Sequence, residues 1–468
     1  MDVGADEFAE TLSFLHDIIN EADFVSLDIQ FTGLCSNSSR PQQISLFDLP
    51  SEWYMKTRQS VQQFTICRIG LSVFSSIEGE SNKYVAHSCN FFLFPTTFGI
   101  LDSEFSFQAS SVQFLNKFFK NGIPYMNEEQ EIKESILRGN WRVGSSLDKD
   151  QIKVVIDKED DRMTLPGIAG FQAYEVQMVL RQKVSQPHRW YLENDSCDQI
   201  RCWREEILLS ARGFSGFIKM LVRAQKSLVG HNMMMDLLHL LEKFFKPLPE
   251  SYDEFKQNIH SLFPVIIDTK NVTEDIWKEI SDLNATNNSG PEIIHASECE
   301  KYAETKCPHE AGYNAFLCGS VLLKVAHLLL ERVHAHLTYL DVLEHYVNQV
   351  NLIRAGVPKI NLSGPDYPSI WPPALILTVK RAWGHRFQYL CRLDVRRFTP
   401  NQFLLLTNKF KDACSVLKEY RSHPTLQVSL YCYWKHSSNI TCLLKVCSII
   451  TTWAVVAFVL GRSSPRVH

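Results

Sequence analysis

The hydrophobic positions near the start of the chain change from a helical spacing to longer apolar runs. Between residues 6 and 22 they recur every three or four positions, which predicts an amphipathic helix. Residues 24–29 then predict a buried strand, and residues 64–76 and Lys83–Pro95 predict two more. Because sequential strands usually pair, we expect an antiparallel meander beside the first strand.

Helices and strands alternate further along the chain. The predicted elements are helices near 110–120, from 173 and near 208–225, a strand at 227–230, a helix at 233–245, a strand at 263–270 and a long helix after Pro308. Charged residues are dense over 128–161, and residues 149–172 predict a loop or linker. The helix at 233–245 is expected to bury Met234, Leu237, Leu238 and Leu241. This alternation predicts an α/β fold.

A second, smaller unit is predicted after residue 370. Strands at 374–379, 393–398, 403–408 and 426–434, a short helix near 383–391 and a helix at 410–420 give a β-α-β-β-α-β order. We therefore expect a large α/β domain over residues 1–360 and a small α/β unit over 370–435.

A long apolar run lies near the C-terminal end. Residues 441–461 are about as long as a bilayer-spanning helix, roughly 20 residues, and are interrupted by Lys445 near the start. The alternative is a buried C-terminal helix. The acidic N-terminal segment has no apolar core typical of a secretory signal. We expect a tail anchor that leaves the folded body in the cytosol, on the endoplasmic reticulum or the mitochondrial outer membrane.

Composition excludes several classes of protein. The 468 residues include 45% hydrophobic and 21% charged residues, which is enough for two or three globular domains and excludes a fibrous or disordered chain. The net charge of −4 gives no overall attraction to phosphate, so RNA would need a local basic groove. The 13 cysteines contain no CxxC pair, which indicates a reducing compartment and disfavours a zinc module or a disulfide framework.

Polar residues follow several of the predicted apolar segments. Asp28 and Gln30 share one face of the first strand, because side chains at i and i+2 point the same way. Two carboxylates there would hold a divalent ion, whereas an acid and an amide hold it less well. Asp236 lies in the first turn of a predicted helix, where an acid also interacts favourably with the helix dipole. His309 precedes the long helix, and Asn314 follows it by five residues; a lone His there is more often structural.

Together these segments resemble the poly(A)-specific ribonuclease family of DEDD 3′-to-5′ exonucleases, which have a ribonuclease H-like mixed sheet flanked by helices. The similar stretches are ADFVSLDIQFTGL, FFLFP, FKNGIPY, LVGHNMMMDLLHL, FPVIIDTK and HEAGYNAFLCG. They extend over nearly the whole chain. The apolar tail is similar to that of the membrane-anchored germline branch, which trims the 3′ ends of precursor Piwi-interacting RNAs.

The resemblance implies a role for each of these residues. Family members bind two Mg²⁺ ions through a strand Asp and Glu, a helix Asp and a final Asp, and a His assists deprotonation of the attacking water. The corresponding residues here are Asp28, Gln30, Asp236, Asn314 and His309. Two of the four carboxylates are therefore amides, which keep the shape of the side chain but lack the charge that Mg²⁺ requires.

RNA contacts do not depend on those two charges. Phe31 follows the strand pair, where it could stack on the terminal base or be an ordinary core Phe. Lys270 could reach a phosphate or be a solvated Lys, and the resemblance implies the phosphate contact. The small unit resembles an RNA-recognition motif, but its stretch FLLLTNKF lacks the aromatic residues that stack bases. We interpret it as a packing or dimerisation unit. Residues 170–212 are too short for the additional nucleic-acid-binding module of the soluble deadenylase.

Two functions follow from these observations. The first is a 3′-to-5′ exoribonuclease that shortens poly(A) tails or trims piRNA precursors and is impaired by Gln30 and Asn314. The alternative is a catalytically inactive RNA-binding or scaffold protein on a membrane. The resemblance implies RNA with a free 3′ end, Tudor-domain and Piwi proteins and a membrane as partners, and homodimers are possible.

Overall fold

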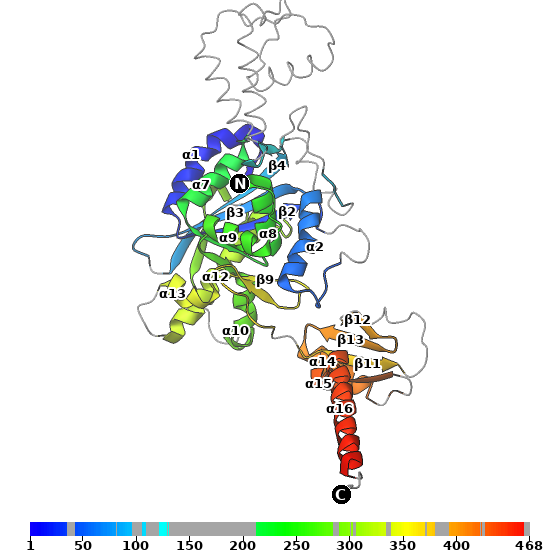
Figure 1. The fold of residues 1–468 in the computed structure, drawn as a ribbon. Coiled ribbons are helices and arrows are strands. Elements are labelled where there is room, and N and C mark those ends of the chain that lie inside the picture. Colours follow the sequence, from blue (N-terminus) through cyan, green and yellow to red (C-terminus); the bar gives the residue numbers. More distant parts are fainter. Residues whose placement is uncertain are drawn as a thin grey trace, which may run out of the picture. The chain divides into compact units, whose positions relative to one another are not determined.

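The structure is a computed structural model of the chain (Figure 1). It describes residues 1–34, 43–80, 82–95, 105–108, 121–128, 130, 212–283, 290–299, 301–302, 306–333, 338–369, 372–379, 393–421, 423 and 426–462. The predicted helices near 110–120, from 173 and near 383–391 and the predicted linker at 149–172 lie outside these residues, as does the start of the predicted helix near 208–225.

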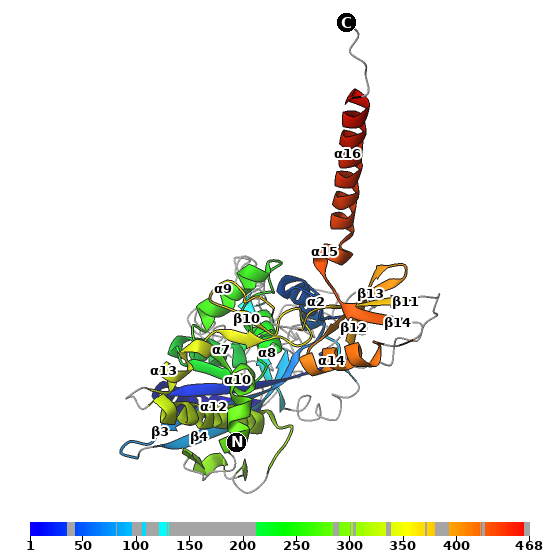
Figure 2. The same ribbon diagram turned by 90° about the horizontal axis from the view of Figure 1, so that it is seen from below.

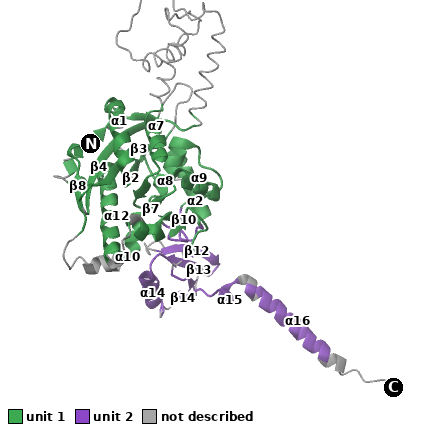
Figure 3. Cartoon of the chain, turned by 90° about the vertical axis from the view of Figure 1, so that its left-hand side faces the viewer, with its two compact units in different colours: residues 1–43, 50–353, 359–367 green, residues 44–49, 354–358, 368–468 purple. Residues whose placement is uncertain are grey.

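The chain forms two compact units (Figure 3). Unit 1 comprises Met1–Gln43, Pro50–Ile353 and Lys359–Tyr367. Unit 2 comprises Ile44–Leu49, Arg354–Pro358 and Pro368–His468. Two short segments of unit 2, Ile44–Leu49 and Arg354–Pro358, are therefore flanked on both sides in the sequence by residues of unit 1.

The described residues of unit 1 contain an eight-stranded mixed sheet. Its strands are β1 (Asp2–Val3), β2 (Phe24–Phe31), β3 (Ile66–Ser76), β4 (Lys83–Pro95), β5 (Ile123–Tyr125), β6 (Ser227–Gly230), β7 (Ile266–Asp268) and β8 (Glu292–His295). The order is β1-β4-β3-β2-β6-β7, and β5 and β8 also pair with β4. β2, β3 and β4 are antiparallel neighbours, which confirms the predicted meander, whereas β6 and β7 are parallel to β2. A separate antiparallel pair consists of β9 (Gln349–Asn351) and β10 (Lys359–Asn361).

Helices surround this sheet (Figures 1 and 2). They are α1 (Ala5–Glu21), α2 (Pro50–Gln63), α7 (Phe214–Ala224), α8 (Met234–Leu240), α9 (Tyr252–Leu262), α10 (Thr269–Leu283), α12 (Ala311–Val333) and α13 (Tyr339–Leu343), with short 3₁₀ turns at Ser297–Cys299 and Glu344–Tyr346. The predicted helix at 233–245 ends as a π-helical turn, η5 (Leu241–Phe245). Its four predicted core residues are buried.

Helix α12 packs closely against the sheet because glycine leaves room for it. A Cβ atom on Gly70 of β3 would lie 1.9 Å from the carbonyl carbon of Ala311, which is far inside van der Waals contact. The Ser26 hydroxyl of β2 donates to the Ala315 carbonyl at 2.7 Å. The first turns of α12 are thereby held over the centre of β2 and β3, beside the predicted site residue Asp28.

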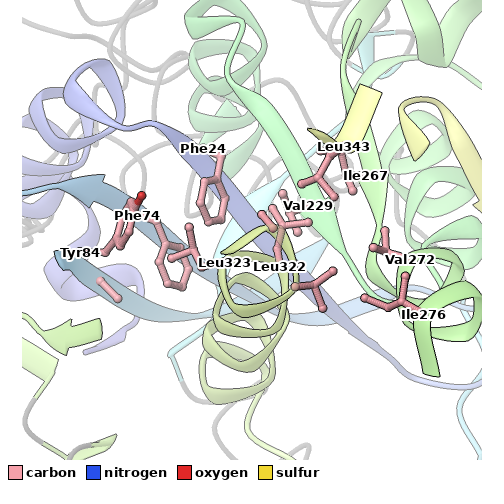
Figure 4. Packing of buried hydrophobic residues seen from close by; sticks show 13 residues of the cluster. Phe24, Phe74, Tyr84, Val229, Ile267, Val272, Ile276, Leu322, Leu323 and Leu343 are labelled. Atoms are coloured by element: carbon pink, nitrogen blue, oxygen red, sulfur yellow. The ribbon is translucent and has the colours of Figure 1, made fainter. Parts of the chain in front are cut away.

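The core beside α12 joins both sheet and helices. Figure 4 shows Phe24, Phe74 and Val229 from three strands packed against Leu322 and Leu323 of α12. Among the described residues, Ala311–Glu331 is the one helix long and apolar enough to cross a membrane by length and composition, and 56% of its most apolar 18-residue window is buried. Its apolar length is therefore explained by burial in this core.

Unit 2 contains a four-stranded antiparallel sheet in the order β12-β13-β11-β14. The strands are β11 (Leu375–Val379), β12 (Leu393–Thr399), β13 (Gln402–Thr407) and β14 (Leu426–Leu430), and α14 (Phe410–Glu419) covers one face. The predicted last strand, 426–434, is too long, because Tyr433–His436 form the short helix α15.

The apolar C-terminal run is helical. Figure 2 shows α16 (Ser438–Arg462) as one continuous helix that follows α15. Its apolar part among the described residues is Cys442–Phe458, which is shorter than the length required of a membrane span. The predicted anchor at 441–461 therefore stays a prediction.

Candidate functional site

Asp28 lies near the C-terminal end of β2, opposite Gly70 of β3. Residue 70 adds no side chain on that face, so the carboxylate faces the start of α12, and the Asn314 amide Nδ2 donates to its Oδ2 at 3.2 Å. Burial raises the pKa of Asp28 to about 6, and the Asn314 hydrogen bond lowers it in part. Among the described residues, the one donor to the Asp28 carboxylate that the structure gives is thus the Asn314 amide.

Asp236 approaches β2 from α8. Its Oδ1 accepts a hydrogen bond from the Ile29 backbone N–H at 3.1 Å, although the two residues are 207 positions apart. Burial raises the pKa of Asp236 well above its ordinary value, and the nearby charge of Asp28 raises it further. Two carboxylates therefore meet at the end of β2.

Gln30 and His309 are joined by a hydrogen bond. The Gln30 Nε2 donates to the backbone carbonyl of His309 at 2.6 Å. His309 is exposed and has a φ of +72°, in the left-handed region that non-glycine residues rarely adopt. Its ring is thus presented from a tight turn immediately before α12.

A polar network holds this turn. The Glu310 Oε2 accepts hydrogen bonds from the Lys301 ammonium at 2.7 Å and the Tyr302 hydroxyl at 3.1 Å. Asn90 of β4 donates its amide to Glu310 at 3.3 Å and accepts from the Gly312 N–H at 2.6 Å. The position of His309 is consequently determined by residues of β4 and of the segment before α12.

Asp268, at the end of β7, has a different environment. Its carboxylate is fully buried and accepts four backbone N–H groups, from Asn232, Met233, Lys270 and Asn351, at 2.7 to 3.1 Å. These bonds join the turn before α8, the start of α10 and β9. Sequence reasoning missed this role, because the donors are backbone groups that leave no pattern in the sequence.

Phe31 and Lys270 lie at the edges of this region. The Phe31 ring is partly buried and stacks on His239 of α8, with ring centroids 4.0 Å apart. The Nδ1–H of His239 donates to the Met235 backbone carbonyl at 2.9 Å, and burial lowers the pKa of His239 to about 3, so the ring is neutral. The side chain of Lys270 is partly buried.

The structure thus brings together Asp28, Gln30, Asp236, His309 and Asn314. The hydrogen bonds that connect them run from Asn314 to Asp28, from Gln30 to the His309 carbonyl and from the Ile29 backbone to Asp236. His239 is the neighbour of this group that sequence reasoning missed; its i+3 spacing from Asp236 is the signal that could have found it.

The donor set does not fit two divalent ions. In the part of the chain that the structure describes, no group of three or more His, Cys, Asp or Glu side chains is placed to hold a metal. The amides of Gln30 and Asn314 donate N–H bonds in this arrangement, whereas Mg²⁺ requires several oxygen ligands. The Asn314 amide N–H therefore occupies an oxygen of the Asp28 carboxylate, which is the kind of ligand a cation needs.

Comparisons with known proteins identify relatives over the whole chain. The poly(A)-specific ribonuclease PNLDC1 of Mus musculus is 72% identical, over 99% of this chain and all of the relative. The pre-piRNA 3′-exonuclease trimmer of Bombyx mori is 26% identical, over 93% of this chain and 94% of the relative. A solved structure of S. pombe Pop2p with Mg²⁺ and Mn²⁺ aligns over 75% of this chain and 97% of that one, with 14% identity and a TM-score of 0.36.

A sequence model of the CAF1 family ribonucleases also matches residues 3–322. This match covers more than half of the chain and includes each of the five residues that meet at the end of β2. The chain belongs to the CAF1 ribonuclease family.

Proposed function

We propose that this chain binds the 3′ end of single-stranded RNA and is a 3′-to-5′ exoribonuclease with strongly reduced turnover. The observation that carries the proposal is the meeting of Asp28 and Asp236 at one strand end, beside the exposed His309. The names of its relatives suggest poly(A) tails or the 3′ ends of piRNA precursors as substrates. Both are RNA with a free 3′ end.

The reduced turnover follows from charge. Replacing two carboxylates by amides removes two negative charges from a site that must offset two divalent cations in active members of the exonuclease class. Mg²⁺ binding is therefore expected to be weak. RNA affinity depends instead on Phe31, whose ring is supported by His239, and on Lys270. A stacked base contributes about 1 to 3 kcal/mol.

The test is reversal of the two amides. Gln30→Glu and Asn314→Asp are made singly and together, and the 3′ shortening of an RNA with an adenosine tail is followed with Mg²⁺ present. We expect a gain of at least about 100-fold only in the double variant, since each single variant still lacks a ligand. Full activity of the unmodified chain would contradict the proposed impairment.

A second candidate is an inactive RNA-binding scaffold. The hydrogen bonds of Gln30 and Asn314 favour it, because they satisfy the site without a cation. The double variant discriminates between the two candidates. If it binds RNA but stays inactive, the defect extends beyond the two amides and the scaffold function is preferred.

We propose that α16 is a membrane anchor with the folded units on the cytosolic side of the endoplasmic reticulum or mitochondrial outer membrane. Large apolar side chains on it are exposed, including Leu444 at 61%, Trp453 at 70% and Phe458 at 62%. The hydroxyls of Thr451 and Thr452 donate to backbone carbonyls three or four residues earlier, as polar groups in lipid must. Deleting residues 441–468 should release the protein into the soluble fraction; a truncated chain that still sediments with membranes after a high-salt wash would refute the anchor.

A further inference from the structure

In unit 2, helix α14 covers one face of the four-stranded sheet, and the opposite face is not covered by α14. Leu375, Leu377 and Leu405 pack with Ala413 and Val416 of α14. Side chains alternate along a strand, so the neighbouring residues of β11 and β13 point to the opposite face. These residues are Ile376, Leu404 and Leu406.

Two residues of β12 belong to this opposite face. Asp394 is paired with Leu406, and Arg396 with Leu404. Directly opposed residues of antiparallel strands share a face. In RNA-recognition motifs, the sheet is the surface on which bases stack. We therefore call the surface formed by Ile376, Asp394, Arg396, Leu404 and Leu406 the open sheet face.

Asp394 is bound by two segments that are distant in the sequence. Its Oδ2 accepts the Leu46 N–H at 2.6 Å and the Ser45 hydroxyl at 3.0 Å, and its Oδ1 accepts the Arg354 guanidinium at 2.6 Å. The Asp394 side chain is 12% exposed. Charge-assisted bonds of this kind are among the stronger hydrogen bonds in proteins.

Further contacts hold the same segments. The Phe47 ring lies 6.0 Å from the Arg396 guanidinium carbon. The Gly356 N–H donates to the Asp48 carbonyl at 2.7 Å, so the two segments also bind each other. Leu46 and Ala355 are buried, as is Ile376, which is 1% exposed although α14 lies on the other face.

From these contacts we infer that the open sheet face is a docking surface for two segments of the same chain, Ile44–Leu49 and Arg354–Pro358, with Asp394 as its anchor. The face that binds RNA in RNA-recognition motifs is therefore occupied by protein, and unit 2 does not bind RNA there. In the sequence, each segment lies between two parts of unit 1. The inference does not depend on the catalytic state of the nuclease site.

Photocrosslinking tests the occupied face directly. The full chain in detergent is irradiated with an oligoadenylate that carries 4-thiouridine near its 3′ end, and crosslinked peptides are identified by mass spectrometry. We expect crosslinks within unit 1 and none within β12 and β13. Crosslinks to Arg396, Leu404 or Leu406 in the unmodified chain would overturn the inference.

Variants of the anchor test the docking itself. In the full chain, Asp394→Ala should speed chymotrypsin cleavage after Phe47 about tenfold, Arg354→Met less and Ser45→Ala least, because they remove three, one and one of the donor contacts. Glu419→Ala, at the exposed end of α14, is the control and should not change the rate. Equal rates in all variants would refute the docking. If Asp394→Ala does not fold, the cleavage rate of Arg354→Met tests the docking instead. This variant should fold, because the Arg354 side chain is 58% exposed.

Discussion

Asp268 and Asp28 lie in the same sheet, and their surroundings differ. Asp268 is fully buried and accepts four backbone N–H groups, whereas Asp28 is partly buried and accepts one side-chain amide. Burial raises the pKa of Asp28 to about 6 because so few donors compensate for the lost hydration. The number of backbone donors therefore separates an acid that holds the fold together from an acid that is available for chemistry.

Removing Asp268 should give the largest effect. Asp268→Ala leaves four backbone N–H groups without this acceptor, in two buried and two partly buried hydrogen bonds, and we expect the free energy of unfolding to fall by about 4 kcal/mol. Denaturant unfolding of the full chain measures this value. Asp253→Ala, at an exposed acid in the first turn of α9, is the control and should cost less than about 1 kcal/mol. If Asp268→Ala also lowers the free energy of unfolding by less than about 1 kcal/mol, Asp268 does not hold the fold together and does not differ from Asp28 in this respect.

Restoring the carboxylates should make stability depend on Mg²⁺. For the Gln30→Glu, Asn314→Asp double variant, Mg²⁺ at 100 times its Kd should stabilise the fold by about 2.7 kcal/mol. The unmodified chain should show no comparable change. Thermal unfolding with and without Mg²⁺ is the measurement.

The matched control for this variant adds the same two charges elsewhere. Asn20→Asp and Gln257→Glu lie at exposed positions of α1 and α9. If that control gains as much stability from Mg²⁺ as the site variant, the effect is a general response to charge and not ion binding at the end of β2.

The pH dependence of stability should distinguish the two acids further. Because the pKa of Asp28 is raised to about 6 in the folded state, the folded chain binds more protons than the unfolded chain between about pH 4 and pH 6. Its stability should therefore fall as pH rises through this window and then level off. Asp28→Asn removes this loss of stability, which amounts to on the order of 3 kcal/mol at pH 7.

Unfolding measured from pH 4 to pH 7 tests the sign of this effect. The difference in stability between Asp28→Asn and the unmodified chain should grow with rising pH in favour of the variant. The opposite slope would mean that Asp28 is held in its charged form, as an acid with many donors is. The charge of Asp28 also raises the pKa of Asp236, so the two carboxyls titrate as a coupled pair. Asp236 should therefore be titrated in the unmodified chain and in Asp28→Asn.

The smallest effect is expected at Asn314. Asn314→Ala removes the hydrogen bond that lowers the pKa of Asp28, so that pKa should rise further, at a cost of about 1 kcal/mol in stability. Titration of the Asp28 carboxyl by carbon-13 NMR measures the shift. Asn314→Asp instead places a second carboxyl beside Asp28 and should raise one pKa of the pair more strongly.

Local periodicity was sufficient for much of the fold. The apolar runs of β2, β3 and β4 and the helical spacing of α1 and α8 predict these elements to within a few residues. Helices α2 and α9 were not predicted. Their mean hydropathy is low, and their buried residues, such as Tyr54 and Phe255, contact each other across the fold, with ring centroids 5.1 Å apart.

The amino-acid sequence establishes which side chains are available at the site, including the amides Gln30 and Asn314, and the resemblance of their motifs to a nuclease family. What each polar group binds depends on the folded chain: four backbone donors on Asp268, one amide on Asp28, and two distant segments on Asp394. Periodicity depends on neighbours along the chain, whereas the cost of burying a charge depends on donors supplied from anywhere in the fold.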